Sequence, residues 1–196
     1  MGRKSLKETR QKEILKAFYS IAKKEGLENT SIAKVAKHMD INPSLIIHYF
    51  STKEDLLISL NDYILEKYLA LYSSNAGSIE SKEDLMEIID KLFSRKWNRL
   101  FDDSVFYSFY AQTYQSSRLK EKFKNLHDTL HLKFEEALLQ ANTKGIIAVD
   151  NIKVTALQIF SLIDGAYYYL GLVSDKNEYE EKVAVYKQLV MEKLNL

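Results

Sequence analysis

The chain has 196 residues, of which 46% are hydrophobic, with six glycines, one proline and no cysteine. The lack of cysteine excludes disulfides and thiolate chemistry, and the scarcity of glycine and proline argues against a fold rich in β-turns. No apolar run is long enough to span a membrane, and the basic residues 1–10 are not followed by the apolar core of a signal peptide. We therefore expect an all-α protein that is soluble and cytoplasmic.

The charges are distributed unevenly, although the formal net charge is only +1. Residues 1–53 hold 11 Lys and Arg against 5 Asp and Glu, whereas the remaining residues hold 17 against 22. A basic head on an acidic body is typical of a DNA-binding module joined to a domain with another task. We expect a DNA-binding domain over residues 1–55 and a second domain over residues 56–196.

The first predicted helix covers about residues 7–24. Ile14, Phe18 and Ile21 fall on one face, and Gly26 follows as a C-cap signal. The basic residues before it either form an arm along DNA or a frayed, solvated tail. These basic residues are Arg3, Lys4, Lys7 and Arg10.

Residues 30–56 predict two short helices and the start of a third. Thr30 and Ser31 are N-capping residues before a helix over about residues 31–38. Asn42 and Pro43 are an N-cap followed by a proline at the first helical position, so a second short helix begins there. The turn between them has about three residues, which fits a helix-turn-helix.

The second short helix has two different faces. Ile46, Tyr49 and Phe50 cluster on the side expected to be core, and Ser44, Ile47 and His48 cluster opposite, with Leu45 at the edge. Lys53 lies in the first turn of the next helix, where a cation opposes the helix dipole and suggests an outside anion such as a DNA phosphate. The predicted DNA contacts are Asn42, Pro43, Ser44, Leu45, Ile47, His48, Tyr49 and Lys53.

The middle of the chain predicts four further helices. The first runs from Lys53 to about Ser73. Ser81 and Asp84 form a capping box that opens an amphipathic helix reaching Leu100. A short aromatic helix follows over about residues 104–114, and a longer one covers about residues 118–141.

The last two predicted helices cover about residues 154–173 and 178–194. Asp150 is the expected cap of the first, which is apolar nearly all round. A helix without a polar face must be covered on both sides. The body's own core supplies one cover and a second copy of the chain the other, so we expect a homodimer.

Aromatic residues gather between Trp97 and Tyr114 and again at residues 167–169. Each ring is readily explained by core packing, but several together also suit a ligand cavity. A cationic or quaternary-ammonium ligand fits through cation–π attraction, and a flat aromatic or acyl ligand fits nearly as well. The candidate ligand-binding residues are Trp97, Phe101, Tyr110, Tyr114, Asp164 and Tyr168.

Catalytic and metal motifs are not recognised in the sequence. His127 and His131 have the spacing of metal ligands on one helix face, but no known motif places a third ligand, so we predict a solvated polar face and no metal site. No nucleophile elbow, phosphate-binding glycine loop or HExxH is found. We expect neither a cofactor nor enzymatic activity.

Residues 7–60 contain a spaced set of residues: Ile14, Ala17, Phe18, Gly26, Thr30, Val35, Ala36, Ile41, Tyr49, Phe50, Lys53 and Leu56. This set resembles the DNA-binding domain of the tetracycline-repressor (TetR) family of bacterial regulators, and residues 46–50 are most similar to its choline-responsive BetI branch. Two positions depart from the family pattern, since Asp40 replaces a common glycine and Ile47 a common phosphate-binding tyrosine.

The resemblance implies a homodimeric regulator that binds a pseudo-palindromic operator in double-stranded DNA, as a repressor released by a small molecule. It also implies that the last two helices form a four-helix dimer interface, in which Asp164-Gly165 resembles a common pair. The expected interface residues are Leu157, Phe160, Ser161, Asp164, Tyr168, Tyr186 and Val190. The alternative is a helical ligand-binding or adaptor protein that does not act through an operator.

Overall fold

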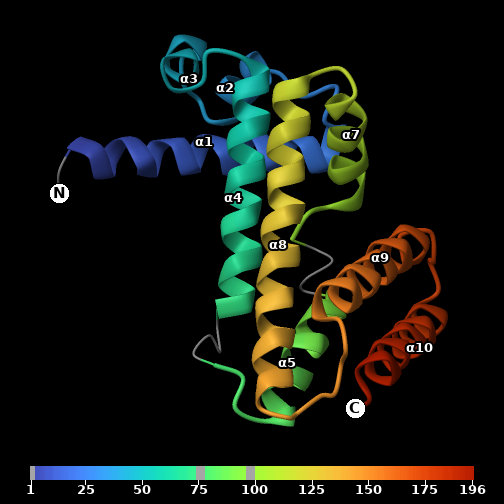
Figure 1. Ribbon diagram of the computed structural model, residues 1–196. Helices are drawn as coiled ribbons and strands as arrows, with labels where there is room; N and C mark the ends of the chain where they lie inside the picture. Colours follow the sequence, from blue (N-terminus) through green and yellow to red (C-terminus); the bar gives the residue numbers. More distant parts are fainter. Residues whose placement is uncertain (1–2, 74–77, 96–99) are drawn as a thin grey trace. The chain divides into compact units, whose positions relative to one another are not determined.

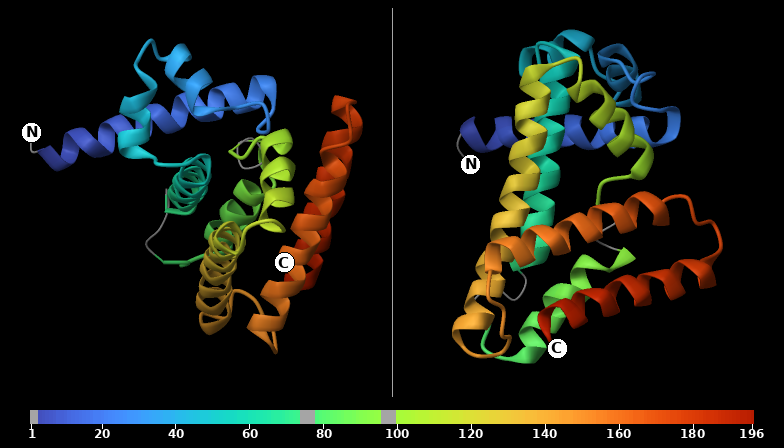
Figure 2. Two further views of the ribbon diagram at one scale, coloured as in Figure 1. Left: turned by 90° about the horizontal axis from the view of Figure 1, so that it is seen from above. Right: turned by 45° about the vertical axis from the view of Figure 1, so that its right-hand side comes forward.

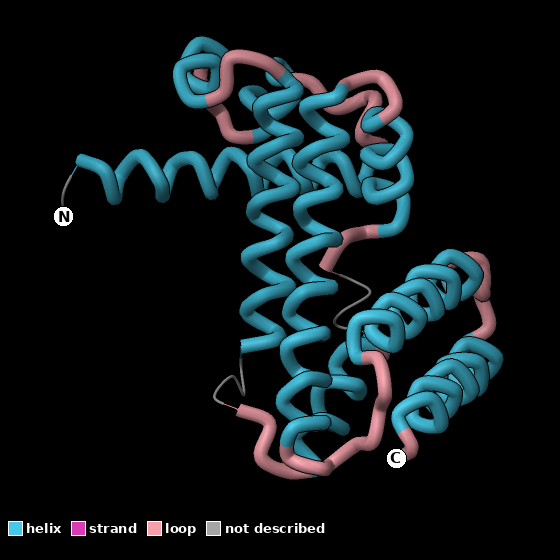
Figure 3. Tube along the Cα trace, in the orientation of Figure 1, coloured by secondary structure: helices cyan, strands magenta, loops and turns pink. Residues whose placement is uncertain are grey.

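The computed structural model describes residues 3–73, 78–95 and 100–196. All regular secondary structure in these residues is helical (Figure 3), as the composition predicted. They form nine helices, labelled in Figure 1: α1 (Arg3–Glu25), α2 (Ile32–His38), α3 (Pro43–Tyr49), α4 (Lys53–Ser73), α5 (Lys82–Leu92), α7 (Asp103–Thr113), α8 (Ser117–Thr143), α9 (Ile152–Leu170) and α10 (Lys176–Leu194).

Polar side chains cap the helices where local sequence predicted them. The Ser31 side chain accepts a hydrogen bond from the Lys34 amide, and Asn42 accepts one from the Ser44 amide. Ser81 and Asp84 form the full capping box of α5. Each cap accepts hydrogen bonds from amides that have no partner within the helix. The position at which these helices begin is therefore determined by a few neighbouring residues.

Three predicted helix boundaries are wrong. α1 begins at Arg3 rather than near Lys7, so the basic residues Arg3, Lys4, Lys7 and Arg10 lie on a helix and not in a frayed tail. Their contact with DNA stays a prediction. α5 ends at Leu92 rather than Leu100, since both the amide and the hydroxyl of Ser94 donate to the Lys91 carbonyl and close a turn. α9 is capped by Asn151 and not by Asp150, because the Asn151 side chain accepts the Val154 amide.

The chain divides into two compact units, which differ from the domains predicted at residues 1–55 and 56–196. The first unit comprises Met1–Glu66 and Phe101–Leu126, and the second comprises Lys67–Leu100 and His127–Leu196. The first unit therefore adds α7 and the start of α8 to the helix-turn-helix. Its fully buried side chains come from several helices, including Ile14 and Phe18 of α1, Ile46 of α3, Leu56 of α4 and Phe109 of α7.

The second unit packs α5 and the end of α8 with α9 and α10. Figure 2 shows α9 and α10 running alongside each other. The Tyr167 hydroxyl of α9 donates to the Leu92 carbonyl at the end of α5, at 2.6 Å, and Phe134 of α8 contacts Phe160 of α9 with ring centroids 5.4 Å apart. None of the described helices is long and apolar enough to cross a membrane.

Candidate nucleic-acid interface

The turn between α2 and α3 is tight and requires a left-handed residue. Asp40 occupies this position with φ of 52°, a conformation that Asp tolerates better than most side chains. Backbone bonds close the turn, from the Met39 amide to the Val35 carbonyl and from the Ile41 amide to the Ala36 carbonyl, both at 3.0 Å. Asp40 thus takes over the geometry for which the TetR pattern commonly has glycine.

The two faces of α3 are as different as its sequence predicted. Ile46 and Phe50 on one side are 0% and 3% exposed, which anchors the helix in the core of the first unit. On the other side, Ile47 is 49% exposed, and Ser44 and His48 are also exposed. A short hydroxyl, an apolar group and an imidazole therefore face outward on one helix, and these are groups that read base edges in the major groove.

The remaining predicted contacts on α3 lie at its start and its edges. Asn42 and Pro43 are exposed at the N-terminus, where the Asn42 carboxamide oxygen also accepts the Ser44 hydroxyl at 2.8 Å. Leu45 and Tyr49 are half-buried, and the Tyr49 ring packs edge-on against His48 with centroids 5.2 Å apart. Tyr49 therefore belongs partly to the core and partly to the surface, where it contacts the His48 ring.

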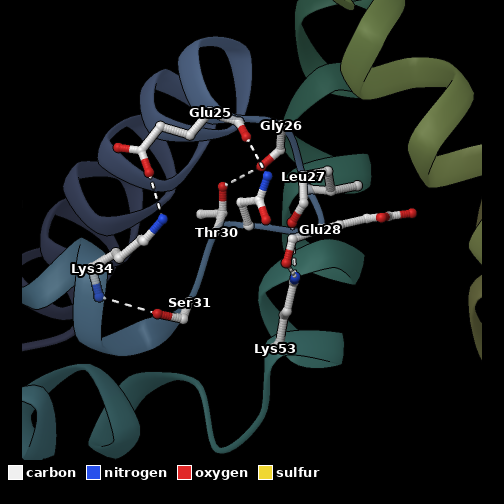
Figure 4. Close-up of polar contacts among 9 residues, drawn as sticks. Glu25, Gly26, Leu27, Glu28, Thr30, Ser31, Lys34 and Lys53 are labelled. Atoms are coloured by element: carbon white, nitrogen blue, oxygen red, sulfur yellow. Dashed lines mark hydrogen bonds and ion pairs between the residues drawn. The ribbon is translucent and has the colours of Figure 1, made fainter.

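Lys53 has partners inside the first unit. Its ammonium donates to the Leu27 carbonyl at 2.7 Å and to the Glu28 carbonyl at 3.1 Å, in the loop after α1 (Figure 4). Desolvation lowers the pKa of Lys53, although the Glu28 carboxylate opposes the shift. Two carbonyls thus compensate the cation at the start of α4 without an outside anion. The predicted contact with a DNA phosphate would be made by the third N–H of the ammonium.

The start of α4 is also held by residues distant in sequence. Asp55 accepts the Thr52 amide and forms an ion pair with Arg118 of α8 at 2.8 Å, and the Ser116 hydroxyl donates to Glu54. Side-chain hydrogen bonds from Arg118 and Thr52 lower the pKa of Asp55. No local sequence signal marks Ser116 and Arg118, because their partners lie on another helix.

The predicted ligand-binding residues do not lie together in one unit. Phe101 is buried in the first unit against Phe106, with centroids 5.3 Å apart. Tyr110 and Tyr114 of the same unit are exposed, and their hydroxyls are 2.9 Å apart. Asp164 and Tyr168 belong to the second unit, and Trp97 lies outside the described residues.

A cavity of about 480 Å³ in the first unit has a different lining from the predicted ligand site. It lies between α1 and α4, and none of the predicted ligand-binding residues lines it. Its walls are formed by Glu8, Gln11, Lys12, Leu15, Phe50, Ser59, Asp62, Tyr63 and Glu66.

The predicted dimer residues divide into buried and exposed groups. Phe160 and Val190 are only 3% and 1% exposed within a single chain, so they pack in the core of the second unit and offer little surface to a partner. Leu157 and Tyr168 are 58% and 64% exposed. Ser161 and Asp164 are also exposed, and Tyr186 is half-buried.

Sequence reasoning missed part of this exposed apolar surface. Because the sequence of α9 is apolar nearly all round, its pattern does not show which side of the helix is exposed and which is buried. The structure adds five large exposed hydrophobic residues on or beside α9 and α10: Val154, Tyr169, Leu172, Val185 and Leu189.

Two family descriptions together cover most of the chain. Residues 14–60 match "Bacterial regulatory proteins, tetR family", and residues 80–196 match "Tetracyclin repressor-like, C-terminal domain". The transcriptional regulator PksA of Bacillus subtilis (strain 168) is 22% identical over 160 residues, which span 81% of this chain and 77% of that protein. The regulator BetI of Vibrio campbellii is 24% identical over 172 residues, which span 85% of this chain and 83% of that protein.

Solved structures share the fold at low sequence identity. A TetR transcription regulator from Haloarcula marismortui superposes with a TM-score of 0.83 at 17% identity, covering 96% of this chain and 97% of that one. A putative transcriptional regulator from Saccharomonospora viridis, solved in complex with choline, superposes with a TM-score of 0.80 at 14% identity. The match covers 94% of this chain and 96% of that one. Both family matches, together with the exposed face of α3, show that the chain belongs to the tetR family of bacterial regulatory proteins.

Proposed function

We propose that this protein is a homodimeric repressor that binds a pseudo-palindromic operator and is released from it by a small molecule. The observation that carries the proposal is the pair of opposed faces on α3, with Ile46 fully buried and Ile47 half exposed. A rigidly anchored helix can present the same outward side chains to a major groove in every complex.

The homodimer is supported by the exposed apolar surface of the second unit, which includes Leu157 and Tyr168. Contiguous exposed apolar surface on a soluble protein commonly marks an interface. A two-fold dimer would hold two copies of α3 at a fixed spacing. The half-sites of the operator should then be separated by about 10 base pairs, or a multiple of that, centre to centre.

The test is to select DNA from random duplexes with the purified protein and to measure affinity for the selected sequence over a range of salt concentrations. We expect an inverted repeat and a steep decrease of affinity with salt, because neutralising phosphates releases counterions. A selection that returns no sequence preference, together with salt-independent binding, would support the adaptor or ligand-binding protein instead.

Ser44 and His48 are expected to read individual bases. Replacing either with Ala should change preference at one or two operator positions and cost about 1–3 kcal/mol on the preferred base. Affinity for unrelated duplexes should change little, because neither side chain carries a fixed positive charge. Binding to a panel of single-base operator variants measures the effect, and a uniform loss over the whole panel would contradict the assignment.

The proposed effector is a small cation of the quaternary-ammonium class. The support is indirect: several relatives are BetI regulators, and a protein of the same fold was solved with choline. Tyr168 and Asp164 of the second unit supply an exposed aromatic ring and a carboxylate. Rings and a carboxylate are the groups that recognise such cations.

Linkage gives a direct test of control by the effector. If the effector weakens operator binding, operator DNA must weaken effector binding by the same factor, which is typically about 5–150-fold. We expect choline or a related amine to bind less tightly to the operator complex than to the free protein, as measured by calorimetric titration. Equal affinities in the two titrations would show that this class of ligand does not control operator binding.

A further inference from the structure

Three potential metal ligands meet in the second unit. His127 and His131 lie one turn apart on α8, and Asp164 lies on α9. One ligand atom from each residue lies within 4.8 Å of the others. The sequence alone predicted no metal site here, because spacing on α8 supplies only two ligands and the third comes from another helix.

The surroundings of His131 favour a metal over a purely structural role. Its Nε2 atom is buried and has no hydrogen-bond partner among the described residues. Its ring packs against Phe160 with centroids 4.1 Å apart, which fixes the ring plane. A buried nitrogen without a partner is costly, and a bound cation would remove that cost.

The local charges agree with the binding of a cation. Burial lowers the pKa of His127 to about 4 and also lowers the pKa of His131, which favours the uncharged imidazoles. Asp128, whose charge acts on both imidazoles, adds negative charge nearby.

We propose that His127, His131 and Asp164 bind a divalent transition-metal ion, with Zn²⁺ the best match. Two imidazoles and one carboxylate suit Zn²⁺ and its neighbours in the first transition row. Bonds of about 2.0–2.2 Å in a tetrahedral site place ligand atoms about 3.4 Å apart. Side-chain rotations would bring the three atoms, which lie within 4.8 Å of one another, to this spacing. Three protein ligands leave the fourth position open for water or for an anionic group of a small molecule.

A quaternary ammonium is the competing occupant of this place. It would be attracted by the Asp164 carboxylate and by the Phe160 ring, but it has no acceptor orbital for an imidazole lone pair. The two ligands therefore share Asp164 but differ in their dependence on the imidazoles. Loss of the Asp164 charge weakens both, whereas loss of an imidazole nitrogen weakens only the metal.

The experiment uses the full-length chain, freed of metal with a chelator and titrated at pH 7.5 with Zn²⁺ by calorimetry and with Co²⁺ by visible absorption. We expect one ion per chain, a Co²⁺ spectrum typical of a tetrahedral nitrogen and oxygen site, and a melting temperature that rises with added Zn²⁺. His131→Gln and Asp164→Asn should each weaken Zn²⁺ binding at least about 10-fold, by loss of one of three ligands.

His38→Gln is the matched control, because His38 is an exposed histidine on α2 of the first unit. It should leave Zn²⁺ affinity and stoichiometry unchanged. Asp164 is exposed and Asn has nearly the same shape, so Asp164→Asn tests the site even if His131→Gln does not fold. Zn²⁺ binding that is absent, or that survives both ligand substitutions, would overturn the proposal, as would choline binding that needs His131. None of these outcomes depends on operator DNA, so the site is judged separately from the proposed function.

Discussion

Replacing Leu157 with Glu is expected to convert the protein from a dimer into a monomer. Leu157 is 58% exposed in the single chain and lies on the apolar surface assigned to the partner. A carboxylate there would be buried without a counter-charge in each copy, at a cost of at least about 3 kcal/mol, or about 100-fold in the dimer dissociation constant. Sedimentation velocity measures the oligomeric state directly.

Operator affinity should fall when the dimer is lost, because a single copy of α3 reads only one half-site. Leu132→Glu provides a closely matched control. Leu132 on α8 is 56% exposed, so the same chemical change is made at the same exposure on a helix not assigned to the interface. The control should stay dimeric and bind the operator normally. A monomeric Leu157→Glu protein with unchanged operator affinity would show that dimerisation is not needed for DNA recognition.

The helix-turn-helix could be predicted from the sequence because its determinants are local. Ser31 and Asn42 cap helices through amides two or three residues away. The alternation of Ile46 and Ile47 between core and surface follows from helical periodicity alone. Each of these features can be deduced from fewer than ten consecutive residues.

Features that depend on another helix could not be predicted. Phe160 is expected at the dimer interface, and the structure shows it 3% exposed, with its ring against His131 and Phe134 of α8. Asp164 meets the two histidines of α8 only because α9 packs against that helix. Sequence periodicity states which face of a helix is apolar, but it does not state which element covers that face.

Lys53 shows the same limit at the candidate interface. The helix dipole suggested that the cation at the start of α4 has an outside anion as its partner, and that contact stays a prediction. The compensation found is the pair of carbonyls of Leu27 and Glu28, which the loop after α1 brings to the ammonium. One side chain thus joins α4 to the loop that precedes α2, at the base of the helix-turn-helix.

Lys53→Met should therefore have two separable effects. Without DNA, the free energy of unfolding should fall by about 1–3 kcal/mol, because two carbonyls lose a charged donor while the aliphatic packing is largely kept. With DNA, affinity should fall by a similar factor for every sequence, and the slope of affinity on salt should decrease by about one unit. Denaturant titration measures the first effect and salt-dependent binding to several duplexes measures the second.

Lys16→Met is the control, since Lys16 is an exposed lysine on α1 outside the predicted contacts. Its unfolding free energy should change by less than about 0.5 kcal/mol and its salt slope should be unaltered. If Lys53→Met lowers stability but leaves the salt slope at its original value, the ammonium holds the loop and does not meet a phosphate. If the salt slope falls while stability is unchanged, the two carbonyl bonds contribute nothing measurable, and the ammonium acts on DNA alone.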